Sequence, residues 1–147
     1  MKLGIDINNS DISSKIREEL KDKGYQIVNI GLESKTSIGE EVFRKAILVN
    51  TSRLEFFVSI NITEGENNVE VYYESDEYSK KFSHEVIRKM NEMGISDISL
   101  EHGENFYLIK NTDVPTVLIK LKLNDLNSKK EILVQKLIQC IEYMKNN

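Results

Sequence analysis

The sequence predicts an α/β fold, in which about six mainly parallel strands form one sheet with helices on both faces. Strand-like and helix-like patterns alternate along the chain almost without interruption. Residues 54–60 form an apolar run, which is typical of a central strand that is covered on both faces. No linker, repeat or low-complexity segment divides the 147 residues, so we expect a single domain over residues 1–147.

The first half of the chain alternates short apolar strands with two helical patterns. The predicted strands cover residues 2–7, 25–30, 54–60 and 68–73. Ser10 or Asp11 can cap the first helix, which ends at Gly24. The spacing of Ser37 and Glu40 is that of a capping box for the second helix. The apolar face predicted for this second helix consists of Val42, Phe43, Ala46, Ile47 and Val49. A hairpin-like turn at residues 64–67 leads into the fourth strand.

The second half repeats this alternation. One helical stripe, which ends at Gly94, consists of Tyr78, Phe82, Val86, Met90 and Met93. Short strands are predicted at residues 95–100 and 106–109, and a longer one at residues 114–121. Pro115 lies near the start of that strand, where a missing ladder donor is tolerated. The face of a last helix consists of Leu133, Leu137, Ile141 and Met144.

Composition excludes several classes of function. The net charge of −4 and the isoelectric point near 5.3 argue against nucleic acid as the main partner. Cys140 is the single cysteine, so the chain forms no internal disulfide. We see no signal peptide and no apolar run that spans a bilayer. The expected location is the cytoplasm, or outside the cell if the chain is exported within a larger protein or released by lysis.

Five segments, in the same order along the chain, resemble the zinc-dependent N-acetylmuramoyl-L-alanine amidases of bacterial cell walls (type 3). The strand end Ser59-Ile60-Asn61 is similar to the S-I-H of that family. The other similar segments are Ile5-Asp6, Val69 to Tyr73, Asn105 to Lys110, and Thr112 to Ile119. The resemblance covers nearly the whole chain and implies an amidase-like fold.

The same resemblance implies that the catalytic residues are lost. The two zinc-binding histidines of the family correspond to Asn9 and Asn61, and the catalytic Glu corresponds to Lys120. The loop that would carry a glutamate ligand is absent, because Asp11 leads almost directly into the first helix. Asparagine and lysine are poor ligands for zinc, which favours Cys, His and carboxylates. We therefore expect no zinc, no other cofactor and no catalysis.

Other polar residues leave alternatives open. Glu101, His102 and Glu104 could hold a metal, although a solvated loop is the simpler interpretation. Asp6 and Asp11 are expected to fill structural roles such as capping. Lysines around the last strand, with Lys120 at its end, could make the former zinc cleft a positive pocket for a wall carboxylate or phosphate. The possible ligand groove consists of Asp6, Asp11, Thr63, His102, Glu104, Lys120 and Lys122.

Three functions remain on this basis. The first is an inactive amidase-like domain that recognises peptidoglycan or another wall polymer, or accompanies active lytic enzymes. The second is a protein–protein module that regulates or assembles with a cell-wall enzyme, or associates with itself, because the fold alone does not determine the function. The third is an enzyme with relocated residues, for which the sequence offers no complete set of base, nucleophile and orienting group.

Overall fold

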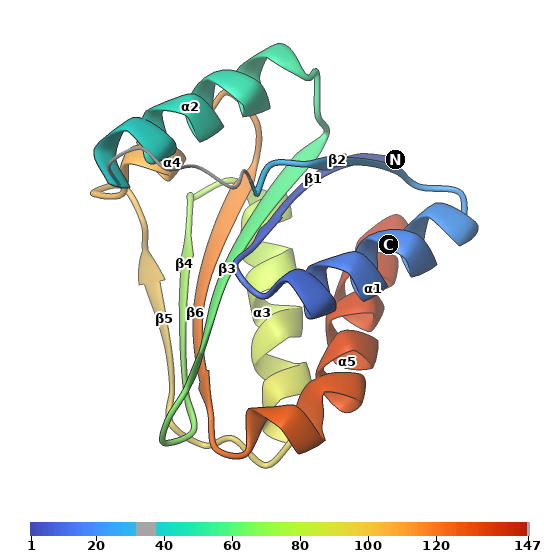
Figure 1. The fold of residues 1–147 in the computed structure, drawn as a ribbon. Helices are drawn as coiled ribbons and strands as arrows, with labels where there is room; N and C mark the ends of the chain where they lie inside the picture. The colour runs from blue at the N-terminus through green and yellow to red at the C-terminus, as the bar shows by residue number, and fades with distance from the viewer. Residues whose placement is uncertain (32–37, 147) are drawn as a thin grey trace.

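A computed structural model describes residues 1–31 and 38–146, and its centre is one six-stranded sheet with the strand order β2-β1-β3-β6-β4-β5 (Figure 1). The pairs β1–β2, β1–β3, β3–β6 and β4–β5 are parallel, whereas β4 and β6 are antiparallel. The mainly parallel sheet predicted from the sequence is therefore confirmed. The strands are β1 (Lys2–Ile7), β2 (Gln26–Asn29), β3 (Phe56–Glu64), β4 (Asn68–Tyr73), β5 (Ile98–His102) and β6 (Thr116–Leu123).

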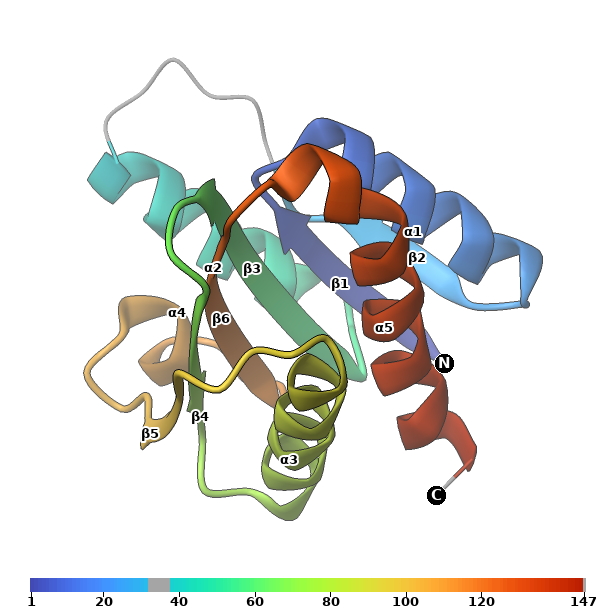
Figure 2. The same ribbon diagram turned by 90° about the horizontal axis from the view of Figure 1, so that it is seen from below.

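Helices cover both faces of the sheet, as predicted, but to different extents. They are α1 (Ser10–Asp22), α2 (Ile38–Thr51), α3 (Glu77–Glu92), α4 (Tyr107–Lys110) and α5 (Leu126–Asn146). The view from below shows α1, α3 and α5 packed along one face (Figure 2). Here Ile16, Phe82 and Leu137 join alternate strand residues in the larger buried cluster.

The second face carries a smaller apolar cluster beneath α2 and α4. Ala46 and Val49 of α2 pack there with Phe57 of β3, Leu118 of β6 and Ile109 of α4. Further along the same face, toward the carboxyl ends of β3 and β6, the outward side chains are exposed. This part of the sheet is the open face discussed below, and it consists of Asn61, Thr63, Lys120 and Lys122.

The turn predicted at residues 64–67 is present, but the strands on either side of it do not form a hairpin. The turn connects β3 to β4, but the two strands do not pair, because β6 lies between them (Figure 1). The sequence signal for a turn was present. The partner of each strand, however, depends on residues 116–123, which are distant in the sequence.

The strand predicted at residues 106–109 is also wrong. The backbone amides of Lys110 and Asn111 donate to the carbonyls of Phe106 and Tyr107, both at 2.9 Å, and close a single helical turn, α4. Leu108 and Ile109 are neighbours in the sequence and both are buried. Two consecutive side chains of a strand point to opposite faces, whereas a helical turn can direct both toward one cluster.

Two details of the helix predictions also change. Asn9, rather than Ser10 or Asp11, caps α1, because its Oδ1 accepts from the backbone amide of Ile12 at 3.0 Å. Ser37, the first residue of the predicted capping box, lies outside the described residues. The apolar face predicted for α2 is divided: Ala46 and Val49 are buried, but Phe43 and Ile47 are 54% and 49% exposed.

Candidate functional site

The positions that the resemblance assigns to catalysis lie near the carboxyl ends of neighbouring parallel strands. Asn9 follows β1, Asn61 lies in β3, and Lys120 lies in β6 directly opposite Asn61 in the strand register. Parallel strands end at the same edge of a sheet, which is a common place for ligand sites in open α/β folds. The register places Asn61 beside Lys120, and Asn9 follows the adjacent strand β1.

Asn8 and Asn9 both form hydrogen bonds within the fold. Asn9 caps α1, as described above. The Nδ2 of Asn8 donates to the carbonyl of Ile62 at 2.9 Å, and its Oδ1 accepts from the amide of Ile62 at 2.7 Å. The carboxamide of Asn8 therefore forms the two hydrogen bonds to β3 that the backbone of one more β1 residue would form.

The donor groups at this edge do not fit a zinc ion. Asn61 presents a neutral amide and Lys120 an ammonium group, neither of which is an ordinary protein ligand of zinc. Within residues 1–31 and 38–146, no group of three or more His, Cys, Asp and Glu side chains could hold a metal ion. The loss of zinc binding itself stays a prediction until it is measured.

Lys120 is held by two aromatic rings. Its Nζ lies 5.7 Å from the centroid of the Tyr72 ring and 5.3 Å from that of Phe106. The two ring centroids are 4.6 Å apart at an interplanar angle of 51°. Such cation–π contacts attract the ammonium group without neutralising its charge. Lys120 is exposed and makes no ion pair within the described part of the chain.

A glycine allows α4 to bring Phe106 to this position. A Cβ at Gly103 would overlap the Cδ1 of Ile109 and would lie 3.2 Å from the Cβ of Tyr72. The chain therefore passes close to β4 and α4 at Gly103, and a larger residue there would require Ile109 to change its side-chain conformation. Desolvation of Tyr72, followed by the nearby carboxylates of Glu70 and Glu101, raises the pKa of the Tyr72 hydroxyl, which stays protonated at neutral pH.

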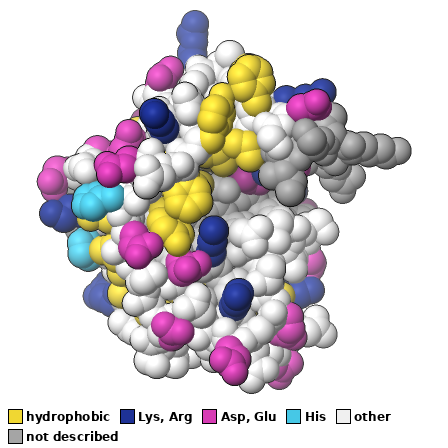
Figure 3. Space-filling view, turned by 90° about the vertical axis from the view of Figure 1, so that its left-hand side faces the viewer, with side chains coloured by type: hydrophobic (Ala, Val, Ile, Leu, Met, Phe, Trp, Pro, Cys, Tyr) yellow, Lys and Arg dark blue, Asp and Glu magenta, His cyan; other side chains and the backbone are white. Residues whose placement is uncertain are grey.

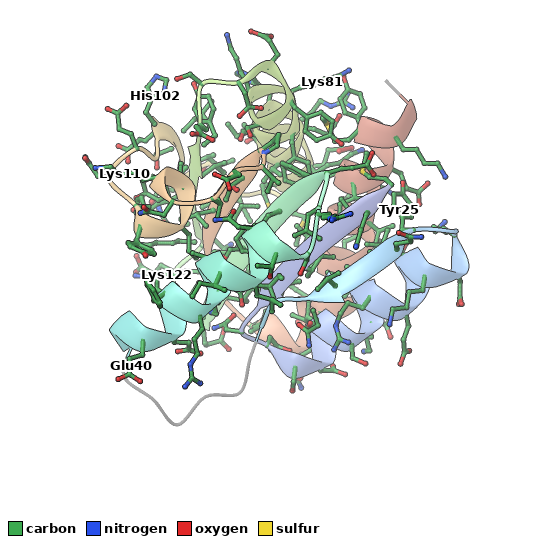
Figure 4. The ribbon with its side chains drawn as sticks, turned by 90° about the horizontal axis from the view of Figure 1, so that it is seen from above. Tyr25, Glu40, Lys81, His102, Lys110 and Lys122 are labelled. Carbon is green, nitrogen blue, oxygen red and sulfur yellow. The ribbon has the colours of Figure 1, made fainter. Side chains whose placement is uncertain are left out.

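The open face is hollowed between β3, β6 and β4. A depression of about 470 Å³ is lined by Asn61, Thr63, Asn68, Glu70, Lys120, Leu121 and Lys122. Lys122 projects on the side of the sheet that carries α2 (Figure 4). Thr63, Lys120 and Lys122, which the sequence placed in a ligand groove, are thus brought together. Asn68 and Glu70 complete the depression, and only the antiparallel pairing of β4 with β6 reveals their place.

Asp6 is adjacent to this edge but buried. Its side chain accepts a hydrogen bond from the Oγ of Ser59 at 2.8 Å, and the Nζ of Lys45 in α2 lies 3.1 Å from its Oδ2. Asp6 is only 6% exposed, so the ion pair connects β1 to α2. These contacts agree with the structural role expected for Asp6. That role is a buried ion pair between β1 and α2, however, and not the capping of a helix.

Asp11 points away from the open face. Its Oδ2 lies 3.4 Å from the Nζ of Lys15 and 3.5 Å from that of Lys130. Lys130 belongs to α5, which packs on the opposite face of the sheet. The structure therefore does not bring Asp11 into the predicted groove.

His102 and Glu104 are also separated from the groove. β4 and β5 run antiparallel to β6. His102 is opposite Tyr73 of β4, and Tyr73 is opposite Val117, which lies near the start of β6. The His102 ring stacks on Tyr73 at 5.1 Å, and its Nδ1 lies 3.4 Å from the Oγ of Ser75. Figure 4 shows His102 near Lys110, beside α4. The sequence could not reveal this because it gives no strand direction.

An apolar patch lies next to the open face, over α2 and α4. Phe43, Ile47 and Tyr107 are 54%, 49% and 42% exposed, and the rings of Phe43 and Tyr107 are 6.4 Å apart. Figure 3 shows hydrophobic side chains gathered in the upper part of this side of the molecule, with separate basic and acidic side chains below them. We refer to Phe43, Ile47 and Tyr107 as the apolar patch.

Comparison with known proteins identifies a family for this chain. The family model of N-acetylmuramoyl-L-alanine amidases matches residues 6–140. No curated protein matches the sequence. No helix within the described residues combines the length and the apolar character needed to cross a membrane.

Several solved structures share the fold over nearly the whole chain. The CwlD amidase of Clostridioides difficile, solved in complex with the GerS lipoprotein, has a TM-score of 0.79 and 18% identity, with 99% of this chain and 98% of that chain covered. The catalytic domain of the CwlV amidase of Bacillus (Paenibacillus) polymyxa var. colistinus has a TM-score of 0.75 and 19% identity, with 99% of each chain covered. The AmiC2 amidase of Nostoc punctiforme has a TM-score of 0.77 and 13% identity, with 100% and 98% covered.

Proposed function

The chain belongs to the N-acetylmuramoyl-L-alanine amidase family, and on this premise we propose that it is a non-catalytic member that recognises peptidoglycan or another cell-wall polymer. The observation that carries the proposal is the set of side chains Asn9, Asn61 and Lys120 at the edge of the sheet. A hydrolytic amidase needs a metal that polarises the scissile carbonyl and a base that moves a proton. An ammonium group at Lys120 carries no lone pair for that role.

The fold nevertheless keeps an open and polar binding face. The depression between β3, β6 and β4 can hold part of a polymer, and its lining offers two ammonium groups, two carboxamides and a hydroxyl as hydrogen-bond donors, beside the single carboxylate of Glu70. Such a domain would target a larger protein to the wall or accompany active lytic enzymes. This role requires the chain to reach the wall, either within an exported protein or after lysis.

Calorimetric titration with zinc, paired with an assay on purified peptidoglycan, tests the proposal. We expect no stoichiometric zinc binding, no release of peptide from glycan, and sedimentation of the protein with the wall. The catalytic domain of an active amidase serves as the positive control for the first two measurements. Tight zinc binding with amide cleavage would show that a relocated site exists. Failure to sediment with the wall would remove the recognition role.

The apolar patch favours a second candidate, a protein–protein module. Exposed aromatic side chains in a contiguous group are typical of interaction surfaces, and aromatic residues are enriched at their centres. A related amidase has been solved with a lipoprotein partner, so the fold is compatible with a partner of this kind. The partner here would be a cell-wall enzyme or a second copy of the chain.

Sedimentation velocity, with and without an active wall amidase, separates the two candidates. A module that assembles through the patch should sediment faster than a monomer, either alone or when mixed with the amidase. The double variant Phe43→Ser and Ile47→Ser should abolish this increase in sedimentation rate. A chain that sediments as a monomer both alone and with the amidase would reject the second candidate and leave the first unaffected.

A further inference from the structure

The polar side chains near the carboxyl ends of β1, β3 and β6 fall into two groups. Three are engaged within the fold: Asn8 with Ile62, Asn9 with Ile12, and Glu64 with the backbone amide of Leu126 at 3.1 Å. Asn61, Thr63, Lys120 and Lys122 are exposed, and within the described residues their side chains have neither a hydrogen bond nor an ion pair. The hydrogen-bonding groups of this second set are therefore available to a ligand.

The four free side chains form a compact set. In the β3–β6 register Asn61 lies opposite Lys120, and Thr63 lies opposite Lys122. Residues two apart on a strand point to the same face and are separated by about 7 Å. The set therefore presents two ammonium groups, one carboxamide and one hydroxyl to the same depression. All four can donate a hydrogen bond, and ammonium groups can only donate.

The two positive charges of this set form no ion pair with a described residue and face a single carboxylate in the depression. Lysines 15, 23, 45, 89, 130 and 136 each form an ion pair with a carboxylate. Lys120 instead lies over the rings of Tyr72 and Phe106, which attract the ammonium group without neutralising its charge. Glu70 is opposite Lys120 on β4 but forms no ion pair with it, so two cations face one carboxylate in the depression.

We propose that the open face is an oxyanion site, in which Lys120 and Lys122 bind a carboxylate or phosphate group and Asn61 and Thr63 donate additional hydrogen bonds. The inference rests on the proposed recognition of a wall polymer and specifies its chemistry. Two sources share that chemistry: the carboxylates of peptide stems and the phosphodiesters of anionic wall polymers. Charge-assisted hydrogen bonds to such groups are roughly twice as strong as neutral ones.

Sedimentation with three wall preparations distinguishes the sources. The first is wall that keeps its phosphate polymers, the second is wall stripped of them by hydrofluoric acid, and the third is stripped wall whose carboxylates have been amidated. Loss of binding at the second preparation identifies phosphodiesters, and loss at the third identifies carboxylates. Either result supports the oxyanion site. Binding that survives both treatments overturns the site but leaves wall recognition intact.

Wall binding by the double variant Lys120→Gln/Lys122→Gln tests whether these two lysines are responsible for the binding. We expect its affinity for wall to fall by about tenfold or more, and the salt dependence of binding to weaken. The matched control is Lys21→Gln/Lys80→Gln, which removes the same charge from exposed positions on α1 and α3. Equal behaviour of the two double variants would overturn the assignment. Thermal unfolding of both verifies that they are folded.

A titration with inorganic phosphate and with acetate tests the site without any wall polymer. Backbone amide resonances of residues 61, 63, 120 and 122 should shift in the native chain and not in Lys120→Gln/Lys122→Gln. If the native chain fails to bind wall, the proposed function fails, and this titration still decides the inference. Shifts confined to these strands support the oxyanion site, and their absence rejects it.

Discussion

The carboxamide of Asn8 forms two reciprocal hydrogen bonds with the backbone of Ile62, at 2.9 Å and 2.7 Å. β1 ends at Ile7, so this side chain continues the pairing of β1 with β3 by one further step. The next residue, Asn9, is then placed to cap α1. The edge of the sheet where β1 ends is thus closed by the amide side chains of Asn8 and Asn9.

Replacing Asn8 with alanine should lower the free energy of unfolding. Two hydrogen bonds are lost, each with a net contribution of about 0.5–1.5 kcal/mol, so we expect about 1–3 kcal/mol in total. Urea denaturation measures the change. Asn61→Ala is the matched control, because Asn61 is exposed and makes no hydrogen bond to any described residue; its effect should stay within about 0.5 kcal/mol. Equal effects of the two variants would contradict the structural role of Asn8.

Truncation of the second apolar cluster should be strongly destabilising. Phe57 is fully buried and Leu118 is 9% exposed beneath α2 and α4. We expect Phe57→Ala to cost about 3–5 kcal/mol and Leu118→Ala about 2–5 kcal/mol, the range for large-to-small core changes. Phe43→Ala, on the exposed side of α2, should cost far less. Guanidinium denaturation of the three variants provides the comparison, and near-native stability of Phe57→Ala would be incompatible with this packing.

Cys140 should be unreactive in the folded protein. Burial raises the pKa of its thiol to about 12, well above its ordinary value of 9.0. At pH 8.5 iodoacetamide should therefore modify Cys140 in denaturant but not in buffer. The same shift has a consequence for stability. The native state holds this proton more tightly than the unfolded chain does, so its contribution is complete below pH 9 and declines as the pH rises toward 12. Rapid labelling of the native protein would contradict its burial.

Lys120→Glu should not restore amide hydrolysis. The substitution places a carboxylate at the position that the resemblance assigns to the catalytic Glu, but Asn9 and Asn61 remain, and neither is an ordinary zinc ligand. Release of peptide from purified peptidoglycan in the presence of zinc is the appropriate assay. Cleavage by this single variant would show that the correspondence between these residues and the family positions is mistaken.

Much of the fold followed from local patterns. The strands at residues 2–7 and 68–73 were predicted with their observed bounds, because apolar and polar residues alternate there. The ends of α1 and α3 followed from Gly24 and Gly94, whose φ angles are +94° and +84°. The neighbouring places of Asn61 and Lys120 followed from the resemblance, and the register confirms them.

The remainder depended on long-range contacts. The exposure of Phe43 could not be predicted, because helical periodicity does not say which side of α2 meets the sheet. The separation of His102 from Lys120 depends on the direction of β5, and the ring contacts of Lys120 depend on a helical turn where a strand had been predicted. Each of these features involves residues distant in the sequence, for which a local pattern carries no information.

The position of β6 between β3 and β4 has a consequence for biosynthesis. Before residues 116–123 leave the ribosome, the ribbon β2-β1-β3 and the pair β4–β5 share no strand contact. Each then presents an unpaired edge, which is a site for erroneous association during translation. The strand that joins the two ribbons into a single sheet is also the last of the six to be synthesised.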